Sequence, residues 1–303
     1  MTDPRYHFHQ VTYEAITPIH VGSGQDVGIV DLPVIRERTT DHPFLPGSGI
    51  RGALRDRCER EPGALVRRLF GAEGEDEPSA GCVVVLDAHL VLFPVRSIPG
   101  VFRWITAPFP LSRWRSLREY FLGDPGAVPV PAAAPGDGTY AAAGGASLFL
   151  EEYPFERADG IEWSWPAGLL GVPGDHVVLV NDADFLHFVR HATLVRQRNR
   201  LSTAKTVLTG HLFSVEAVPA EARFVGFLGA TRERAAPERV ERLEAADAAA
   251  ELRRLATGEE GGSVAHLTLG GDESVGMGVT RLAWEVAAAR GATMEKAEKG
   301  VVV

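Results

Sequence analysis

The chain has 303 residues, 45% of them hydrophobic, which predicts a globular protein with a substantial core. Its formal net charge of −9 argues against a surface that binds nucleic acid over the whole molecule. The sequence has no run of about 18 apolar residues and no basic-then-apolar N-terminus, and its two cysteines lack metal-ligand spacing, so we expect no membrane span, no signal peptide and a reduced, cytoplasmic location.

The N-terminal part reads as a strand followed by glycine-rich loops. Apolar and polar residues alternate over 11–15, which predicts a half-buried strand. Glycines at 22 and 24 follow. Prolines and the polar segment 39–43 interrupt any regular element before residue 46, so Asp31, set among apolar residues, is expected on a loop or short extended piece.

A helix is expected to follow the turn at 46–49. Ser48 is a natural N-cap, so the helix should start near Gly49. A buried stripe at spacing four is formed by Ile50, Leu54 and Cys58. Arg51 and Arg55 share another face near the positive end of the helix dipole, which favours an anion site. An ordinary solvated face is the alternative.

The middle of the chain carries no clear chemistry. Residues 82–93 read as a central strand, and Ser112 is expected to cap a helix that ends at Leu122. The Pro-, Ala- and Gly-rich segment 123–147 reads as a flexible insertion. The acidic, aromatic segment 151–165 is either partner surface or a satellite apolar cluster under a long loop.

A locally basic segment follows a short helix expected to be capped by Asp182. No acid occurs between residues 185 and 215. The basic residues of its hairpin part are Arg196, Arg198, Arg200 and Lys205. We expect a hairpin over about 193–215 that turns at Thr209-Gly210. Its basic side either faces water or forms a binding surface.

The C-terminal part ends in another glycine-rich loop. Residues 237–257 read as a charged, largely solvated helix. A loop over 270–278 then connects two strands, and its glycines are Gly270, Gly271, Gly276 and Gly278. Glycines let backbone approach a ligand closely, although such a loop is often only a turn. Residues 291–303 read as a flexible tail.

These elements predict an α+β protein whose two βαββ-like halves resemble a ferredoxin or RNA-recognition-motif fold, with long insertions, as a single domain over 1–290. The sequence lacks the sheet-face aromatics with which such motifs stack bases. Recognition of RNA through backbone and shape fits the glycines and arginines better.

Several motifs occur in one order along the chain: Thr17-Pro18-Ile19-His20, Gly22-Ser23-Gly24, Val30-Asp31-Leu32-Pro33-Val34, Gly47-Ser48-Gly49-Ile50-Arg51-Gly52, Pro94-Val95-Arg96-Ser97, Arg198-Asn199-Arg200, Leu212-Phe213 with Glu216, and residues 269–278. In this combination the chain resembles the RAMP superfamily of CRISPR proteins, and more narrowly the backbone subunit of the type III-B (Cmr) effector complex. Met277 stands where many relatives have a basic residue.

The resemblance implies a subunit that binds guide RNA, repeats along a filament with other subunits, and cuts complementary target RNA at regular intervals. The basic hairpin is similar to the family's thumb. Asp31 matches the catalytic aspartate, which would hold a divalent ion, Mg²⁺ or Mn²⁺, or orient a 2′-hydroxyl. His20 is either structural or a proton donor. The RNA-binding candidates are Ser48, Gly49, Arg51 and Arg55, the basic residues of the hairpin, and the glycines of the 270–278 loop.

Two alternatives remain from the sequence. One is a guide-RNA-binding structural subunit that does not cut, as in a type III-A-like complex. The other is an unrelated enzyme or partner protein with a ferredoxin-like core. The role of Asp31 separates the first alternative from a nuclease, and copurifying RNA of discrete length separates both from the second.

Overall fold

The computed structural model describes residues 5–24, 30–61, 63–72, 79–145, 147–201, 203, 205, 207–234 and 241–285. The helices are α1 (Gly47–Cys58), α2 (Ala64–Phe70), α3 (Pro108–Leu122), α4 (Asp182–His191) and α5 (Ala245–Thr257). The longer strands are β1 (Tyr6–Ala15), β6 (Ala88–Ile98), β7 (Phe102–Thr106), β10 (Tyr153–Arg157), β12 (Leu194–Leu201), β13 (Val207–Ala217), β14 (Arg223–Thr231), β15 (Val264–Thr268) and β16 (Val279–Trp284). The short strands are β2 (Phe44–Leu45), β3 (Gly71–Ala72), β4 (Ser79–Ala80), β5 (Val83–Val85), β8 (Thr139–Tyr140), β9 (Leu148–Leu150) and β11 (Val177–Leu179).

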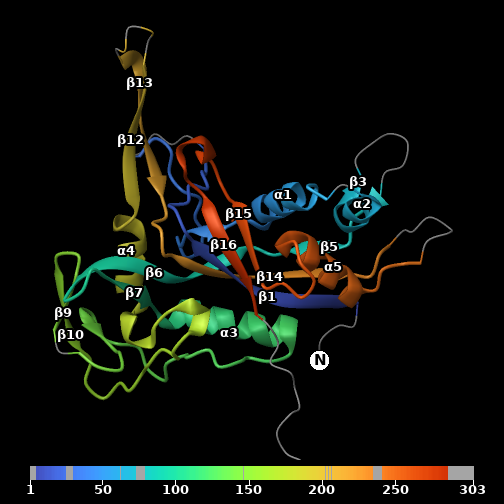
Figure 1. The fold of residues 1–303 in the computed structure, drawn as a ribbon. Coiled ribbons are helices and arrows are strands. Elements are labelled where there is room, and N and C mark those ends of the chain that lie inside the picture. Colours follow the sequence, from blue (N-terminus) through green and yellow to red (C-terminus); the bar gives the residue numbers. More distant parts are fainter. Residues whose placement is uncertain are drawn as a thin grey trace, which may run out of the picture.

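The central sheet has a ferredoxin-like arrangement (Figure 1). Along the chain its core elements are β1, α1, β6, β14, α5 and β16, and in space the strands follow the order β16, β1, β14, β6. All three of these pairings are antiparallel. This is the topology expected from two βαβ-like halves, and a long insertion separates β6 from β14.

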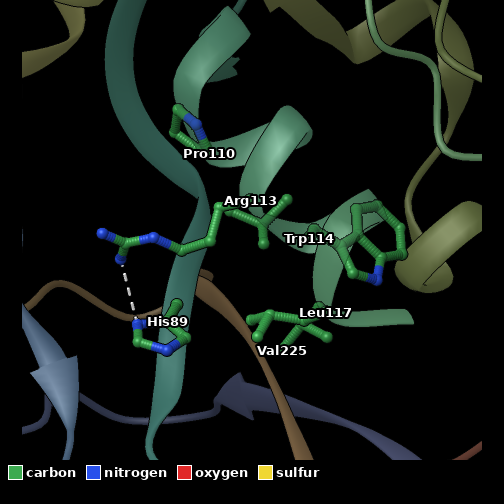
Figure 2. A pocket seen from close by; sticks show the side chains of 7 residues that line it. His89, Pro110, Arg113, Trp114, Leu117 and Val225 are labelled. Carbon is green, nitrogen blue, oxygen red and sulfur yellow. Dashed lines mark hydrogen bonds between the residues drawn. The ribbon is translucent and has the colours of Figure 1, made fainter. Parts of the chain in front are cut away.

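Helices cover both faces of this sheet. Helices α1 and α5 pack together on one face, and α3 contacts β1 and β6 (Figure 1). Successive residues of β14 point to opposite faces, so Phe224 belongs to the core under α1 and α5 while Val225 belongs to a second apolar cluster. Figure 2 shows Trp114 and Leu117 of α3 close to Val225.

Several element boundaries differ from expectation. The strand expected over 82–93 is two strands, β5 and β6, separated at residues 86–87. Helix α3 begins four residues before Ser112, with Ala107 as its N-cap. Helix α4 is capped by Asn181, whose side chain accepts a hydrogen bond from the Asp184 N–H, so the prediction of Asp182 as cap is wrong. In both helices the N-cap is a residue that precedes the expected one.

The helix predicted over 237–257 begins only at Ala245 within the described residues, which exclude 237–240, and it is more buried than expected. Residues 245–257 form α5, and its inner face is made largely of alanines that the charged pattern obscured: Ala245, Ala248, Ala249 and Ala256, with Leu252 and Leu255. Small side chains allow α5 to approach β14 and β1 closely. The expectation of a largely solvated helix is therefore wrong for this face.

The strands β12 and β13 form a two-stranded hairpin that projects away from the central sheet (Figure 1). Leu194 pairs with Ala217, and Asn199 pairs with Leu212. Thr209-Gly210 lies inside β13, so the predicted turn there is wrong, and the chain reverses between Leu201 and Val207. The long basic segment thus forms an extended arm.

The aromatic segment 151–165 contributes to the core. Trp163 and Trp165 are buried in the second apolar cluster with Trp104 and Trp114, as in the satellite-cluster interpretation. Within the expected insertion, β8 pairs with β10, and Tyr140 is buried. The expected tail, 291–303, lies outside the described residues. No helix in the described ranges is long and apolar enough to cross a membrane.

Candidate active site

The segment that carries Asp31 is attached to the base of the hairpin. Leu32 donates its N–H to the Ser214 carbonyl at 3.0 Å, and its own carbonyl accepts the Glu216 N–H at 3.0 Å. This is a parallel bridge between Leu32 and Val215. The segment that begins at Asp31 therefore lies along β13, although β13 comes more than 180 residues later in the sequence.

Asp31 is exposed, yet one of its carboxylate oxygens is fixed by two donors. Oδ2 accepts the Ser214 N–H at 2.7 Å and the Ser214 hydroxyl at 2.8 Å. The Asp31 N–H in turn donates to the Ser214 Oγ at 2.9 Å. The Ser214 N–H, followed by its hydroxyl, holds the pKa of the Asp31 carboxyl below its usual value. The carboxylate is thus ionised at neutral pH, and Oδ1 accepts no hydrogen bond from the described residues.

His20 is buried against the same strand. Its Nδ1 lies 2.6 Å from the Glu216 carbonyl oxygen, which can only accept, so Nδ1 carries a proton. In the neutral ring Nε2 is then the open acceptor. A methyl group on Gly22 would lie 2.9 Å from Nε2, so glycine keeps this nitrogen uncovered.

Strand β13 brings the two catalytic candidates together. Asp31 is fixed by Ser214, and His20 lies against the backbone carbonyl of Glu216; these two residues are about 7 Å apart along β13, and their backbone groups point to one edge of the strand. The Glu216 side chain is buried and accepts hydrogen bonds from the Val34 N–H at 2.9 Å and Arg36 at 2.6 Å. Arg36 also donates to the Val189 carbonyl, which ties the segment to α4.

The sequence interpretation did not assign Ser214, Glu216 or Arg36 to the site. A usable signal was present, because Ser214 and Glu216 are polar residues at spacing two within an apolar strand and so share one face. What they hold depends on contacts across the whole chain.

The C-terminal glycine-rich loop packs against His20. Gly271 donates its N–H to the His20 carbonyl at 2.8 Å. Gly270 has φ of +87°, and a methyl group there would overlap the same carbonyl oxygen. Gly276 and Gly278 also have positive φ, and Gly278 is packed against the Leu269 carbonyl. Met277 is buried.

The hairpin arginines differ in their surroundings. Arg198 donates from Nη2 to the Asp272 carboxylate at 3.1 Å and lies near the Met277 sulfur, so it connects the hairpin to the glycine-rich loop. Arg196 is exposed, and Lys205 is exposed in the turn with φ of 59°. Arg200 lies on β12, and its side chain is outside the described part of the structure.

Helix α1 begins two residues earlier than expected, and Ser48 is not its cap. The N-cap is Pro46, and the Gly47 N–H donates to the Asp87 carboxylate at 2.7 Å. Ser48 and Gly49 are exposed in the first turn, where N–H groups have no intrahelical acceptor.

The two arginines of α1 have protein partners. Arg51 donates to the Phe70 carbonyl at 2.5 Å, and Arg55 pairs with Glu59 at 2.9 Å. Both of these partners lie within residues 59–70, close to the helix in sequence. The helix is thus a separate candidate surface.

A divalent ion finds few protein ligands here. No cluster of three or more His, Cys, Asp or Glu side chains suited to a metal occurs in the described ranges. The Asp31 Oδ1 is a hard oxygen ligand of the kind that Mg²⁺ and Mn²⁺ prefer. One carboxylate fits such an ion only if RNA phosphate and water supply the remaining ligands.

Comparison with known proteins identifies the family. Residues 12–281 match the RAMP superfamily. The chain belongs to the RAMP superfamily. It is 38% identical over 104 residues to the CRISPR system Cmr endoribonuclease Cmr4 of Pyrococcus furiosus, a segment covering 33% of this chain and 35% of that protein. It is 26% identical over 90 residues to the CRISPR system Cms endoribonuclease Csm3 of Enterococcus italicus, covering 25% of this chain and 42% of the relative. The matched segments therefore span less than half of either curated RAMP relative.

Solved structures share the RAMP fold over nearly the whole chain. A type III-B Cmr-beta structure bound to cognate target RNA superposes with a TM-score of 0.71 at 21% identity, over 93% of this chain and 98% of that one. Oligomeric Cmr4 from Pyrococcus furiosus gives a TM-score of 0.64 at 20% identity, over 93% and 98%. These likenesses confirm the predicted α+β RAMP fold with its hairpin.

Proposed function

We propose that this chain is a repeating backbone subunit of an RNA-guided type III CRISPR effector complex, which binds guide RNA and cuts complementary target RNA at regular intervals. Family membership and the names of the relatives support this proposal. The observation that carries it is the exposed Asp31 carboxylate, held ionised by Ser214 at the base of a projecting hairpin. Target RNA that follows the hairpin would pass this carboxylate.

In the proposed reaction, Asp31 Oδ1 accepts the hydrogen bond of the target's 2′-hydroxyl and orients that oxygen for in-line attack on the adjacent phosphate. The 5′-oxygen leaves, and the products are a 2′,3′-cyclic phosphate and a 5′-hydroxyl. The 2′-hydroxyl proton passes to Asp31 Oδ1 as the new O–P bond forms, and the leaving 5′-oxygen takes a proton from the Nε2 of His20 when the ring is protonated at both nitrogens. The alternative for His20 is a structural role between β13 and the glycine-rich loop.

The proposal includes a divalent ion, Mg²⁺ or Mn²⁺, and the alternative role of Asp31 Oδ1 is to hold that ion as a protein ligand instead of accepting the 2′-hydroxyl hydrogen bond. When bound, such an ion stabilises the negative charge that develops on the phosphate. Three groups of residues would contact the RNA backbone: Ser48, Gly49, Arg51 and Arg55 at α1, Arg196, Arg198, Arg200 and Lys205 on the hairpin, and Gly270, Gly271, Gly276 and Gly278 in the loop. Partners are guide RNA, target RNA, further copies of the chain and other complex subunits, in the cytoplasm.

The test compares single-turnover cleavage by reconstituted complexes that contain the wild-type chain, Asp31→Asn or Asp31→Ala. Both changes should lower the rate by about 10²- to 10⁴-fold while guide RNA stays bound. Asp159→Asn, in an exposed turn after β10, is the matched control and should cut normally. Cleavage should stop with chelator, and a 2′-deoxynucleotide 5′ of one scissile phosphate should block that cut alone.

A wild-type rate for Asp31→Asn would reject the catalytic role of Asp31. The remaining candidate function would then be a structural subunit that binds guide RNA but does not cut. That second candidate retains guide binding, so copurification of RNA of discrete length distinguishes both from an unrelated protein with this fold.

A further inference from the structure

The N–H, the hydroxyl proton, the Oγ and the carbonyl of Ser214 all form hydrogen bonds with the segment that carries Asp31. Its N–H and hydroxyl donate to Asp31 Oδ2 at 2.7 and 2.8 Å. Its Oγ accepts the Asp31 N–H at 2.9 Å, and its carbonyl accepts the Leu32 N–H at 3.0 Å. Ser214 is 3% exposed, whereas Asp31 is exposed, so the serine lies behind the carboxylate on the protein side.

This pattern fixes a side chain that would otherwise rotate. An exposed aspartate has freedom about both side-chain torsions, and ordering it costs entropy. Two donors on one oxygen, together with the return bond from the Asp31 N–H, leave Oδ1 as the oxygen presented outward. From these contacts we infer that Ser214 is a positioning residue for Asp31, which holds the carboxylate in one orientation and presents Oδ1 to the RNA.

The inference rests on the proposed function and extends it to the hairpin. Ser214 belongs to β13, whose other end forms the projecting arm. The carboxylate is therefore fixed to the strand that carries the arm, rather than to the central sheet. A displacement of β13 at its base moves the Asp31 carboxylate with it.

Ser214→Ala removes the hydroxyl and keeps the backbone N–H. It should lower single-turnover cleavage by about ten- to a hundredfold, since small misplacements of a reacting group have costs of this size. KM for target and affinity for guide should stay unchanged. The acid limb of the pH–rate profile should move to higher pH, because a carboxylate that loses a donor is protonated more easily. Ser214→Thr, which restores the hydroxyl, should recover both rate and profile.

The matched control is Ser97→Ala. Ser97 is also a buried serine on a strand, and its Oγ has no hydrogen-bond partner among the residues that the structure describes. This change should leave rate and pH profile untouched. If Ser214→Ala folds poorly by circular dichroism, Ser214→Cys, which is nearly isosteric and a weak donor, replaces it.

A second readout does not require cleavage. Carbon-13 NMR of the labelled aspartate carboxyls, assigned with Asp31→Asn, should show that the Asp31 pKa rises in Ser214→Ala and not in Ser97→Ala. An unchanged Asp31 titration together with an unchanged rate would overturn the positioning role. A normal rate in Asp31→Asn would instead overturn the proposed catalysis, and the NMR titration would still decide whether Ser214 holds the carboxylate.

Discussion

Arg198 and Asp272 form an ion pair that joins the base of the projecting hairpin to the C-terminal glycine-rich loop, with 3.1 Å between Nη2 and Oδ2. The buried Met277 sulfur lies on the same guanidinium, and the Arg198 Nε is buried without a partner in the described structure. Two segments that the sequence assigned separately to RNA binding therefore contact each other through one arginine.

Loss of the Asp272 charge should strengthen RNA binding, because Arg198 is then released from its ion pair. Asp272→Asn removes the charge that competes for Arg198 and keeps a residue type that tolerates the φ of 62° found here, so guide RNA should bind about three- to fivefold more tightly. Arg198→Ala should weaken binding. Filter binding across a salt series is the measurement. Glu273→Gln removes the same charge one residue away, and equal tightening by both changes would reduce the effect to general electrostatics.

Gly270 should be intolerant of any side chain. Its φ of +87° and its packing on the His20 carbonyl predict that Gly270→Ala lowers the free energy of unfolding by about 3 kcal/mol. Gly52→Ala is the control, because Gly52 lies in α1 with nothing within 4 Å of an added methyl, and it should be neutral or slightly stabilising. Urea denaturation decides, and equal stability of the two variants would contradict the close approach.

The arginines of α1 should bind RNA phosphate. Arg51→Ala combined with Arg55→Ala is expected to weaken guide binding and to reduce the salt slope by about 0.7 for each lost phosphate contact. The buried stripe of α1 is untouched, although Arg51 also donates to the Phe70 carbonyl, so circular dichroism must accompany the titration. Arg57→Ala, on another face of the same helix, serves as control. An unchanged slope in the double variant would show that these arginines only stabilise the helix.

Glu37 should make stability depend on pH. Burial raises the pKa of this carboxyl, but hydrogen bonds from His89, Arg113 and Thr40 outweigh it, and the net pKa lies below the usual value of 4.5. Figure 2 shows the Arg113 side chain extending from α3 toward His89, and both side chains donate to the same Glu37 carboxylate oxygen, Oε1. A lowered folded-state pKa contributes stability above the unfolded-state value, and this contribution is lost as pH falls.

Glu37→Gln should therefore lower the free energy of unfolding by about 2 kcal/mol at pH 7, and the difference from wild type should shrink below about pH 4.5. Glu59→Gln, at an exposed pair on α1, should change little. Denaturant unfolding at several pH values is the measurement. A difference that stays constant from pH 7 to pH 3 would show that the ionised form of Glu37 contributes nothing.

Local patterns predicted much of the fold. The stripe of Ile50, Leu54 and Cys58 is buried as expected, because helical periodicity is a property of adjacent turns. The strand over 11–15 lies within β1, because alternation of apolar and polar residues is also a local pattern. The ordered motifs predicted the RAMP fold, and they included both Asp31 and His20, which β13 does bring together.

The errors arose where partners are distant in sequence. Ser48 is a good cap by residue type, but Pro46 takes the position because Asp87, from another segment, accepts the Gly47 N–H. Thr209-Gly210 resembles a turn, yet it lies inside β13, at the irregularity where the register with β12 shifts between Asn199 and Leu201. Ser214 and Glu216 hold residues more than 180 positions away, and no local pattern names such a partner.

The two covered faces of the central sheet have a consequence for what the chain can read. With α1 and α5 on one side and α3 on the other, β1, β14 and β6 offer no platform on which bases could stack and be told apart. In a subunit that works as proposed, the protein does not recognise the base sequence of its guide RNA. A cell that acquires a new guide then needs no new protein, because the same fold accepts any spacer and leaves discrimination to base pairing.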